Sequence, residues 1–328
     1  MANVNFQSGA DLISPSFIGS PIVINSNSFV ITTQNSSSFF VYYGNFYYDV
    51  SDNVYGYVTG INYADYSYNS ITFRNMYLDA SYLQYLVENG DTYSFYAYML
   101  SQNDYINGSI FGDRIAGYGG NDTISSHSGN DTVAGGHGDD VVYGGDDNDV
   151  IFGQDGNDYL YGDADNDSIY GQLGNDYLSG GSGADALIGG SGYDLLVGGT
   201  GADYVDGGSE NDVLYGGADG DWLFGGIGDD WVSGDAGNDL VDGQLGNDGM
   251  VGGGGADTFF FNQGFNTIYD YAVGDRVDLS AFSLGSIAVA DWFAIDYNGT
   301  VYFDFGYGNA LLVTGPAALT FADLDITI

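Results

Sequence analysis

The sequence predicts an all-β protein organised around a solenoid of short stacked repeats, with small β-rich caps on both sides. An aspartate returns at every ninth residue, eighteen times from Asp104 to Asp257, without an insertion. An apolar residue follows two places after each aspartate, from Ile106 to Phe259. From residue 108 onward a glycine stands five places before each aspartate, with Ser126 as the exception. A fixed short period indicates a solenoid, because each unit buries its apolar side only by stacking on its neighbours.

The repeating unit reads Gly-Gly-x-Gly-x-Asp-x-apolar-x, as in residues 180–188. Glycine permits the positive φ that tight turns require, and the last three residues alternate outward and inward as a short strand does. One buried apolar residue in nine makes a thin core, and a stacked row of aspartates repels itself. A hard divalent cation with oxygen ligands, such as calcium, would offset that repulsion.

This nonapeptide resembles the RTX, or haemolysin-type, calcium-binding repeat of secreted bacterial proteins. The resemblance implies a right-handed parallel β-roll with two nonapeptides in each of about nine turns. It also implies that calcium lies between successive turns, held by the motif aspartates and by turn carbonyls, so that Asp122 pairs with Asp140 on one edge. The expected calcium ligands are Asp122, Asp131, Asp140, Asp149, Asp158, Asp167, Asp176, Asp185, Asp194, Asp203, Asp212, Asp221, Asp230, Asp239, Asp248 and Asp257.

Several units depart from the motif in ways that leave their effect open. The fourth place holds Asp147, Asp165, Glu210 or Asp219, and the second place holds Gln154, Asp163, Gln172, Asp235 or Gln244. The extra carboxylates either strengthen a calcium site or solvate the turn. The units around Asp104 and Asp113 lack most of the glycines, so we expect them to form a cap with weak or no calcium binding.

The composition limits the possible partners. The chain has 328 residues, a net charge of −42, three basic residues and no cysteine. It therefore lacks the positive footprint that nucleic acid requires, an anionic membrane would repel it, and disulfides cannot stabilise it. About 16 calcium ions would cancel roughly three quarters of the charge. Without calcium, self-repulsion is expected to keep the repeats unfolded, so we hypothesise that the chain folds on export from a calcium-poor cytosol.

Three domains are expected. Residues 1–98 form an aromatic-rich β domain, with strand patterns at 39–43 and 54–61 and a short helix at 79–88. Residues 99–260 form the roll, and residues 261–328 form a C-terminal cap. The first domain either closes the open end of the roll or binds a ligand or surface. We expect neither an N-terminal secretory signal nor a transmembrane segment.

The C-terminal segment carries two further resemblances. Residues 266–280 resemble the segment that closes the roll in serralysin-type secreted proteins, and Asn298-Gly299 predicts a hairpin turn between 293–297 and 300–305. The last four residues, 325–328, resemble the C-terminal signal of type I secretion substrates. These resemblances imply the type I secretion machinery as a partner and a secreted, extracellular or cell-surface location.

No enzymatic activity is expected. The chain has two histidines, no His-Glu-x-x-His, no Gly-x-Ser-x-Gly and no cysteine nucleophile. Carboxylate pairs are abundant, but the calcium ladder accounts for them.

The outward positions of the repeats, seventh and ninth, carry few charges. On one sheet they include Val141, Tyr143, Tyr159, Tyr161, Tyr177, Leu195, Val197, Val213, Tyr215 and Trp231. The other sheet has Val150, Phe152, Tyr170, Ile188, Tyr204, Trp222, Phe224 and Leu240. Such a large apolar surface usually marks an interface, unless a flanking domain covers it. The main hypothesis is a calcium-binding structural protein that self-assembles as a homo-oligomer or polymer. The alternative is a calcium-stiffened adhesin or ligand-binding protein that recognises its target through the N-terminal domain.

Overall fold

The computed structural model describes five strands between residues 22 and 74, and then residues 103–280 except 109 and 111. Towards the C-terminus it describes residues 293–296, 300–306, 308–316 and 324–327. The predicted helix at 79–88 lies outside the described residues. All elements of the described part are strands, and none of it forms a helix long and apolar enough to cross a membrane.

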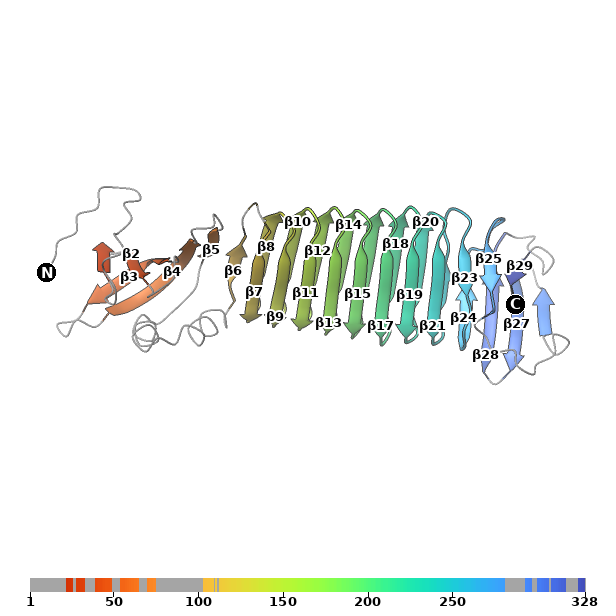
Figure 1. Ribbon diagram of the computed structural model, residues 1–328. Coiled ribbons are helices and arrows are strands. Elements are labelled where there is room, and N and C mark those ends of the chain that lie inside the picture. The colour runs from red at the N-terminus through yellow and green to blue at the C-terminus, as the bar shows by residue number, and fades with distance from the viewer. Residues whose placement is uncertain are drawn as a thin grey trace.

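The repeats form a parallel β-roll whose strands alternate between two sheets (Figure 1). Each strand pairs in parallel with the strand two places along, so that Val142 lies beside Leu160, eighteen residues later. One sheet contains β6 (Tyr105–Asn107), β8 (Thr123–Ser128), β10 (Val141–Asp146), β12 (Tyr159–Ala164), β14 (Tyr177–Ser182), β16 (Leu195–Thr200), β18 (Val213–Ala218), β20 (Trp231–Ala236) and β22 (Gly249–Val251). The other contains β7 (Arg114–Gly119), β9 (Thr132–His137), β11 (Val150–Asp155), β13 (Ser168–Leu173), β15 (Ala186–Ser191), β17 (Tyr204–Ser209), β19 (Trp222–Ile227), β21 (Leu240–Leu245) and β23 (Thr258–Phe260).

The turns between strands need a left-handed backbone at the second and fourth positions of the motif. Gly181 and Gly183 have φ of 110° and 142° there. The residues that replace glycine at these positions keep positive φ, between 64° and 83°. The turns therefore keep the same backbone conformation when Asp or Gln replaces glycine, and these residues adopt a strained left-handed φ.

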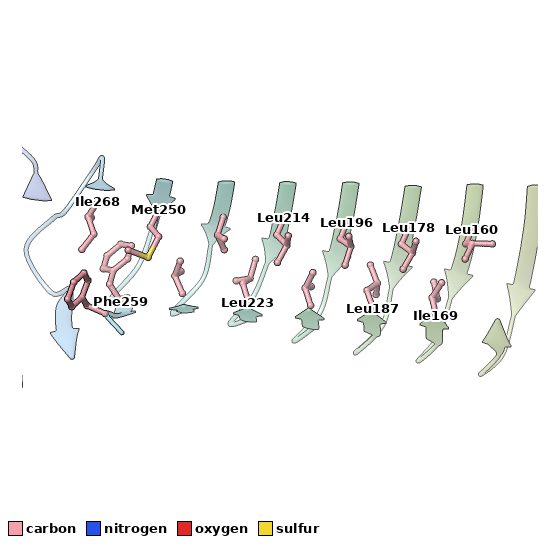
Figure 2. Packing of buried hydrophobic residues seen from close by; sticks show 14 of the residues in the cluster. Leu160, Ile169, Leu178, Leu187, Leu196, Leu214, Leu223, Met250, Phe259 and Ile268 are labelled. Atoms are coloured by element: carbon pink, nitrogen blue, oxygen red, sulfur yellow. The ribbon is translucent and has the colours of Figure 1, made fainter. Parts of the chain in front are cut away.

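The core is a double file of apolar side chains, one from each nonapeptide, between the two sheets (Figure 2). All eighteen residues at the eighth position are buried, as the periodicity predicts, and all but Ile115 are fully inaccessible to solvent. Leu178 and Leu196 stack within one sheet, and Leu187 lies opposite them in the other (Figure 2). Because each side chain depends on the next coil for burial, the roll is stable only as a stack.

The stack continues past residue 260 and exceeds the nine turns expected. Strands β24 (Phe265–Ile268) and β25 (Arg276–Asp278) add to the two sheets in parallel register. The last parallel strands are β28 (Asn309–Thr314) on β24 and β29 (Asp325–Thr327) on β25. Strands β26 (Phe293–Asp296) and β27 (Thr300–Gly306) pair antiparallel on either side of Asn298-Gly299, which confirms the predicted hairpin. The turn residues 297–299 lie outside the described part.

The N-terminal strands form an antiparallel set. These are β1 (Ile22–Asn25), β2 (Ser28–Thr32), β3 (Phe39–Tyr48), β4 (Val54–Ala64) and β5 (Ser70–Arg74). Strands β3 and β4 confirm the strand predictions at 39–43 and 54–61. Strand β5 pairs with β6, so the first sheet of the roll is extended at its N-terminal edge.

Candidate metal centre

The motif aspartates stand in two ladders, one along each edge of the roll where the turns lead into the strands. The backbone N–H of each aspartate donates to Oδ1 of the aspartate eighteen residues later, as from Asp194 to Asp212 at 2.8 Å. The same bond recurs from Asp104 to Asp122 at 2.7 Å and from Asp239 to Asp257 at 2.9 Å. The turns therefore hold each of the sixteen carboxylates from Asp122 to Asp257 by one oxygen, in one orientation.

The second oxygen of each carboxylate has no partner. Oδ2 of all sixteen aspartates predicted as ligands is buried and accepts no hydrogen bond. A buried polar atom without a partner costs about 1–3 kcal/mol, and more when it is charged. A row of identical oxygens without partners fits a row of cation sites, since a cation at each site would satisfy the oxygen there.

The glycine at the first position leaves the space beside this oxygen open. At Gly207, a Cβ would lie 2.5 Å from Oδ2 of Asp212 and 2.5 Å from the carbonyl oxygen of Gly225 in the next coil. Any side chain at Gly207 would therefore press on both oxygens. The first glycine of the motif is required because a carboxylate and a turn carbonyl of successive coils converge there.

The donor set favours a hard cation that accepts backbone carbonyls. No three histidine, cysteine, aspartate or glutamate side chains converge as a metal cluster within the described ranges. A cation there would therefore be held by one or two carboxylates, and turn carbonyls such as that of Gly225 would have to supply the remaining ligands. Calcium takes six to eight oxygen ligands, carbonyls among them, whereas zinc prefers nitrogen and sulfur. The residues present fit calcium.

Burial makes the ladder electrostatically unfavourable without a cation. Burial raises the pKa of Asp212 to about 8, the N–H of Asp194 lowers it, and the negative charges of Asp194, Asp230 and Glu210 raise it further. Burial raises the pKa of Asp122 to about 8 and that of Asp158 to about 7 in the same way. Near neutral pH the metal-free folded roll would therefore retain protons on its carboxyl groups. A bound divalent cation would displace those protons.

Two ladder members beyond Asp257 were missed by the sequence analysis. Asn266 accepts the N–H of Asp248 at 3.0 Å, and Asp275 accepts that of Asp257 at 3.0 Å. Oδ2 of Asp275 also accepts the N–H of Ala272 at 2.7 Å. Both ladders thus end in a residue that the protein itself satisfies. Continuing the nine-residue count would have found both positions, but the glycines are absent there.

At the other end of the roll, the units of Asp104 and Asp113 stack in register despite their missing glycines. Asp104 is buried, and both of its carboxylate oxygens lack a partner. Its environment therefore resembles that of the sixteen predicted ligands, which the loss of glycines had not suggested.

The unit with Ser126 is the one interior variation of the cradle. Its hydroxyl donates to the carbonyl of Gly144 at 2.9 Å, the counterpart of the Gly225 carbonyl beside Asp212. The serine hydroxyl therefore occupies the space beside Asp131 that is open in the other units.

The acidic replacements at the fourth position contribute to the turns. Asp147 accepts the N–H of Gly129 at 3.2 Å, and Glu210 accepts that of Gly192 at 3.0 Å. These exposed carboxylates accept hydrogen bonds from the turn of the preceding coil.

The comparisons with known proteins agree with this geometry. The model of the RTX calcium-binding nonapeptide repeat (4 copies) matches residues 100–268 in overlapping segments, just over half of the chain. The chain belongs to this family. Repeats of this family bind calcium ions at multiple sites. No curated protein matches the chain.

Two solved structures are similar to parts of the chain. The AlgE6R3 subunit of the Azotobacter vinelandii mannuronan C5-epimerase is 30% identical, with a TM-score of 0.28; the match covers 37% of this chain and 80% of that one. The extracellular lipase LipA from Serratia marcescens is 17% identical, with a TM-score of 0.25; the match covers 62% of this chain and 40% of that one.

Proposed function

We propose that this is a secreted structural protein that folds on calcium outside the cell and self-assembles through the outer faces of its roll. The observation that supports the proposal is the aromatic surface on both sheets of an otherwise very acidic chain. The role is non-catalytic, in keeping with the absence of a recognisable nucleophile or zinc motif in the sequence. Export by the type I machinery follows from the family and from the C-terminal segment.

The aromatic side chains form ordered stacks along the coils. Tyr143 and Tyr161 stack with centroids 5.0 Å apart, and Phe152 and Tyr170 do the same on the opposite sheet. Stacking already restricts the rotamers of these side chains. They would therefore lose little further conformational entropy when a partner binds, which favours an interface.

The outer faces are open to solvent. Tyr159 is 52% exposed on the first sheet, and Trp222 is 58% exposed on the second. Among the described residues, nothing covers these two side chains. Contiguous apolar surface of this extent typically marks an interaction site.

Calcium would couple folding to assembly. The calcium-free ladder carries buried, mutually repelling carboxylates, so the faces become flat and ordered only once cations satisfy Oδ2 of each aspartate. Assembly would then begin only where free calcium is plentiful, which is outside the cell.

The test is light scattering after size-exclusion chromatography, across a titration from excess chelator to several millimolar calcium. Large species should form together with β structure, and replacing Tyr143, Tyr161 and Tyr215 with serine should abolish them while calcium binding is kept. Tyr193→Ser, 62% exposed in a turn rather than on a face, is the matched control. A calcium-folded monomer of the wild type would contradict self-assembly and favour the alternative, an adhesin that binds through residues 22–98.

A further inference from the structure

The outer face of the second sheet, from β7 to β21, is unequal along its length. At its N-terminal end β7 and β9 present the small residues Ala116, Thr132 and Ala134 at the outward positions of the motif, and Tyr118 is exposed beyond them near the end of β7. At the other end β17 and β19 present Tyr204, Trp222 and Phe224, and the rings of Tyr204 and Phe224 lie 5.3 Å apart. The half of the face at β7 and β9 therefore carries small side chains and is called the low half. The half at β17 and β19 carries large side chains and is called the raised half.

The register of the strands places these residues in two straight columns. The seventh positions run from Arg114 through Thr132 to Trp222 and Leu240, each beside the next. The ninth positions run from Ala116 through Ala134 to Phe224 and Asp242 in the same way. The strands of the roll lie nearly parallel to one another along the stack (Figure 1).

Charges of opposite sign mark the two ends of this face. Arg114 is exposed on β7, and the ion pairs formed within the described residues do not include it. Asp242 is half-buried on β21; Asn262 Nδ2 at 2.8 Å and the Gln244 N–H at 3.0 Å both donate to its Oδ1. Its Oδ2 is therefore the oxygen that remains to face a partner. Arg276, the other arginine of the column, already pairs with Asp278 at 3.6 Å.

We propose that two copies of this chain pair antiparallel through this face, β7 of each copy opposite β21 of the other, with Arg114 bound to the partner's Asp242. The proposal rests on the self-association proposed above and names its first contact. A two-fold axis along the strand direction places seventh positions opposite seventh positions and ninth opposite ninth.

In that register the raised half of each copy fits the low half of the other. Trp222 lies opposite Thr132, and Phe224 lies opposite Ala134, so large side chains meet small ones. At the centre Tyr170 lies opposite Ile188. At each end of the interface Arg114 lies opposite the partner's Leu240, and Asp242 is its diagonal neighbour two residues along the strand, within reach of the long arginine side chain. The symmetry gives this ion pair once at each end.

The size of the face is sufficient for a dimer. Eight strands at ~4.8 Å spacing span about 40 Å along the stack. A face about 15 Å long in the strand direction then gives roughly 600 Å² per copy. The total of about 1,200 Å² is at the lower end of specific protein interfaces. The second copy is favoured over a cationic partner because the face offers a complement for its own aromatic half. The remaining carboxylate of the ninth column, Asp206, lies opposite the partner's Phe152 and accepts a hydrogen bond from the Tyr204 hydroxyl of its own chain at 3.3 Å.

The test uses the full chain in millimolar calcium, with the dimer dissociation constant measured by sedimentation equilibrium. Arg114→Asp and Asp242→Arg should each weaken the dimer at least tenfold, because like charges meet at both ends. An equimolar mixture of the two variants should associate as strongly as wild type, because both contacts are then restored between unlike copies. Arg276→Gln, a charge loss in the same column outside the overlap, should leave the dimer unchanged, whereas Arg114→Gln should weaken it.

The outcomes separate the two proposals. Single variants that associate as the wild type does would overturn this interface, and so would a mixture that does not recover. The Arg114 and Asp242 variants could still assemble while the serine variant at Tyr143, Tyr161 and Tyr215 does not. In that case self-assembly stands and proceeds through the first sheet. A wild type that remains a monomer at all concentrations would overturn both proposals.

Discussion

Replacing Asp212 with asparagine should have opposite effects with and without calcium. The substitution keeps Oδ1, which accepts the Asp194 N–H, and changes the orphaned Oδ2 into an amide nitrogen. That nitrogen is a donor, and both it and the Gly225 carbonyl border the space at Gly207. Without calcium the change removes a buried charge, and with calcium it removes a charged ligand.

The size of each effect follows from the structure. Burial and neighbouring charges raise the pKa of Asp212 from 3.8 to about 8, so at pH 7 the metal-free folded state is penalised by roughly 4 kcal/mol. Screening by solvent reduces this to about 2 kcal/mol, which the asparagine variant should regain. In calcium, a tenfold loss of affinity at the sites on either side of Asp212 would cost about 3 kcal/mol.

The assay measures both conditions on the same protein. In chelator, folding is driven with trimethylamine oxide, and the variant should fold at a lower osmolyte concentration than wild type. In saturating calcium, the variant should unfold at a lower denaturant concentration. Asp229→Asn, an equal charge change at an exposed turn position, is the control. A variant destabilised in both conditions would refute the interpretation that Oδ2 is held free for a cation.

Three further predictions test the ladder, the core and the turns. In chelator, stability should fall as pH rises from about 4 to about 8, because the folded-state pKa values of about 6 to 8 lie above the unfolded value of 3.8; in calcium it should rise with pH, since the cation requires ionised carboxylates. Thermal unfolding over that pH range, in chelator with trimethylamine oxide to populate the folded state and in calcium, measures the two slopes, and equal slopes would contradict the prediction. Leu187→Ala should lower the unfolding free energy in calcium by about 2–5 kcal/mol in a denaturant titration, because Leu187 is fully buried; Leu173→Ala, at 55% exposed, should change it little. Gly207→Ala should reduce the number of calcium ions bound, measured by isothermal titration calorimetry, since its Cβ would press on Asp212 and Gly225, whereas Gly119→Ala, whose Cβ would make only ordinary contacts at 3.7 Å, should not.

Much of this structure could be predicted from the period alone. The nine-residue count predicts Leu187 and its counterparts in the core and Asp212 and its counterparts in a ladder. The reason is that equivalent residues of stacked coils lie one above the other, and each short strand points one side chain of its motif into the core. The aromatic and β-branched composition of residues 39–43 and 54–61 was enough to predict β3 and β4.

Other features depend on contacts between coils, which the sequence pattern does not display. Oδ1 differs from Oδ2 because it accepts the N–H of an aspartate in the preceding coil. Glycine is favoured at position 207 because the carbonyl of Gly225, eighteen residues away, lies beside it. Asn266 and Asp275 were missed because the glycines end before the ladders do. Asp242 was passed over because only apolar outward residues had been considered.

The most direct test of the account is limited proteolysis of the full chain with circular dichroism, in excess chelator and in millimolar calcium. The account predicts that the repeat region between residues 104 and 275 lacks β structure and is cut rapidly in chelator at pH 7.5. Calcium should restore both β structure and protection, because cations satisfy the orphaned oxygens of the motif aspartates. A repeat region that stays folded and resistant to protease in chelator would contradict the central claim.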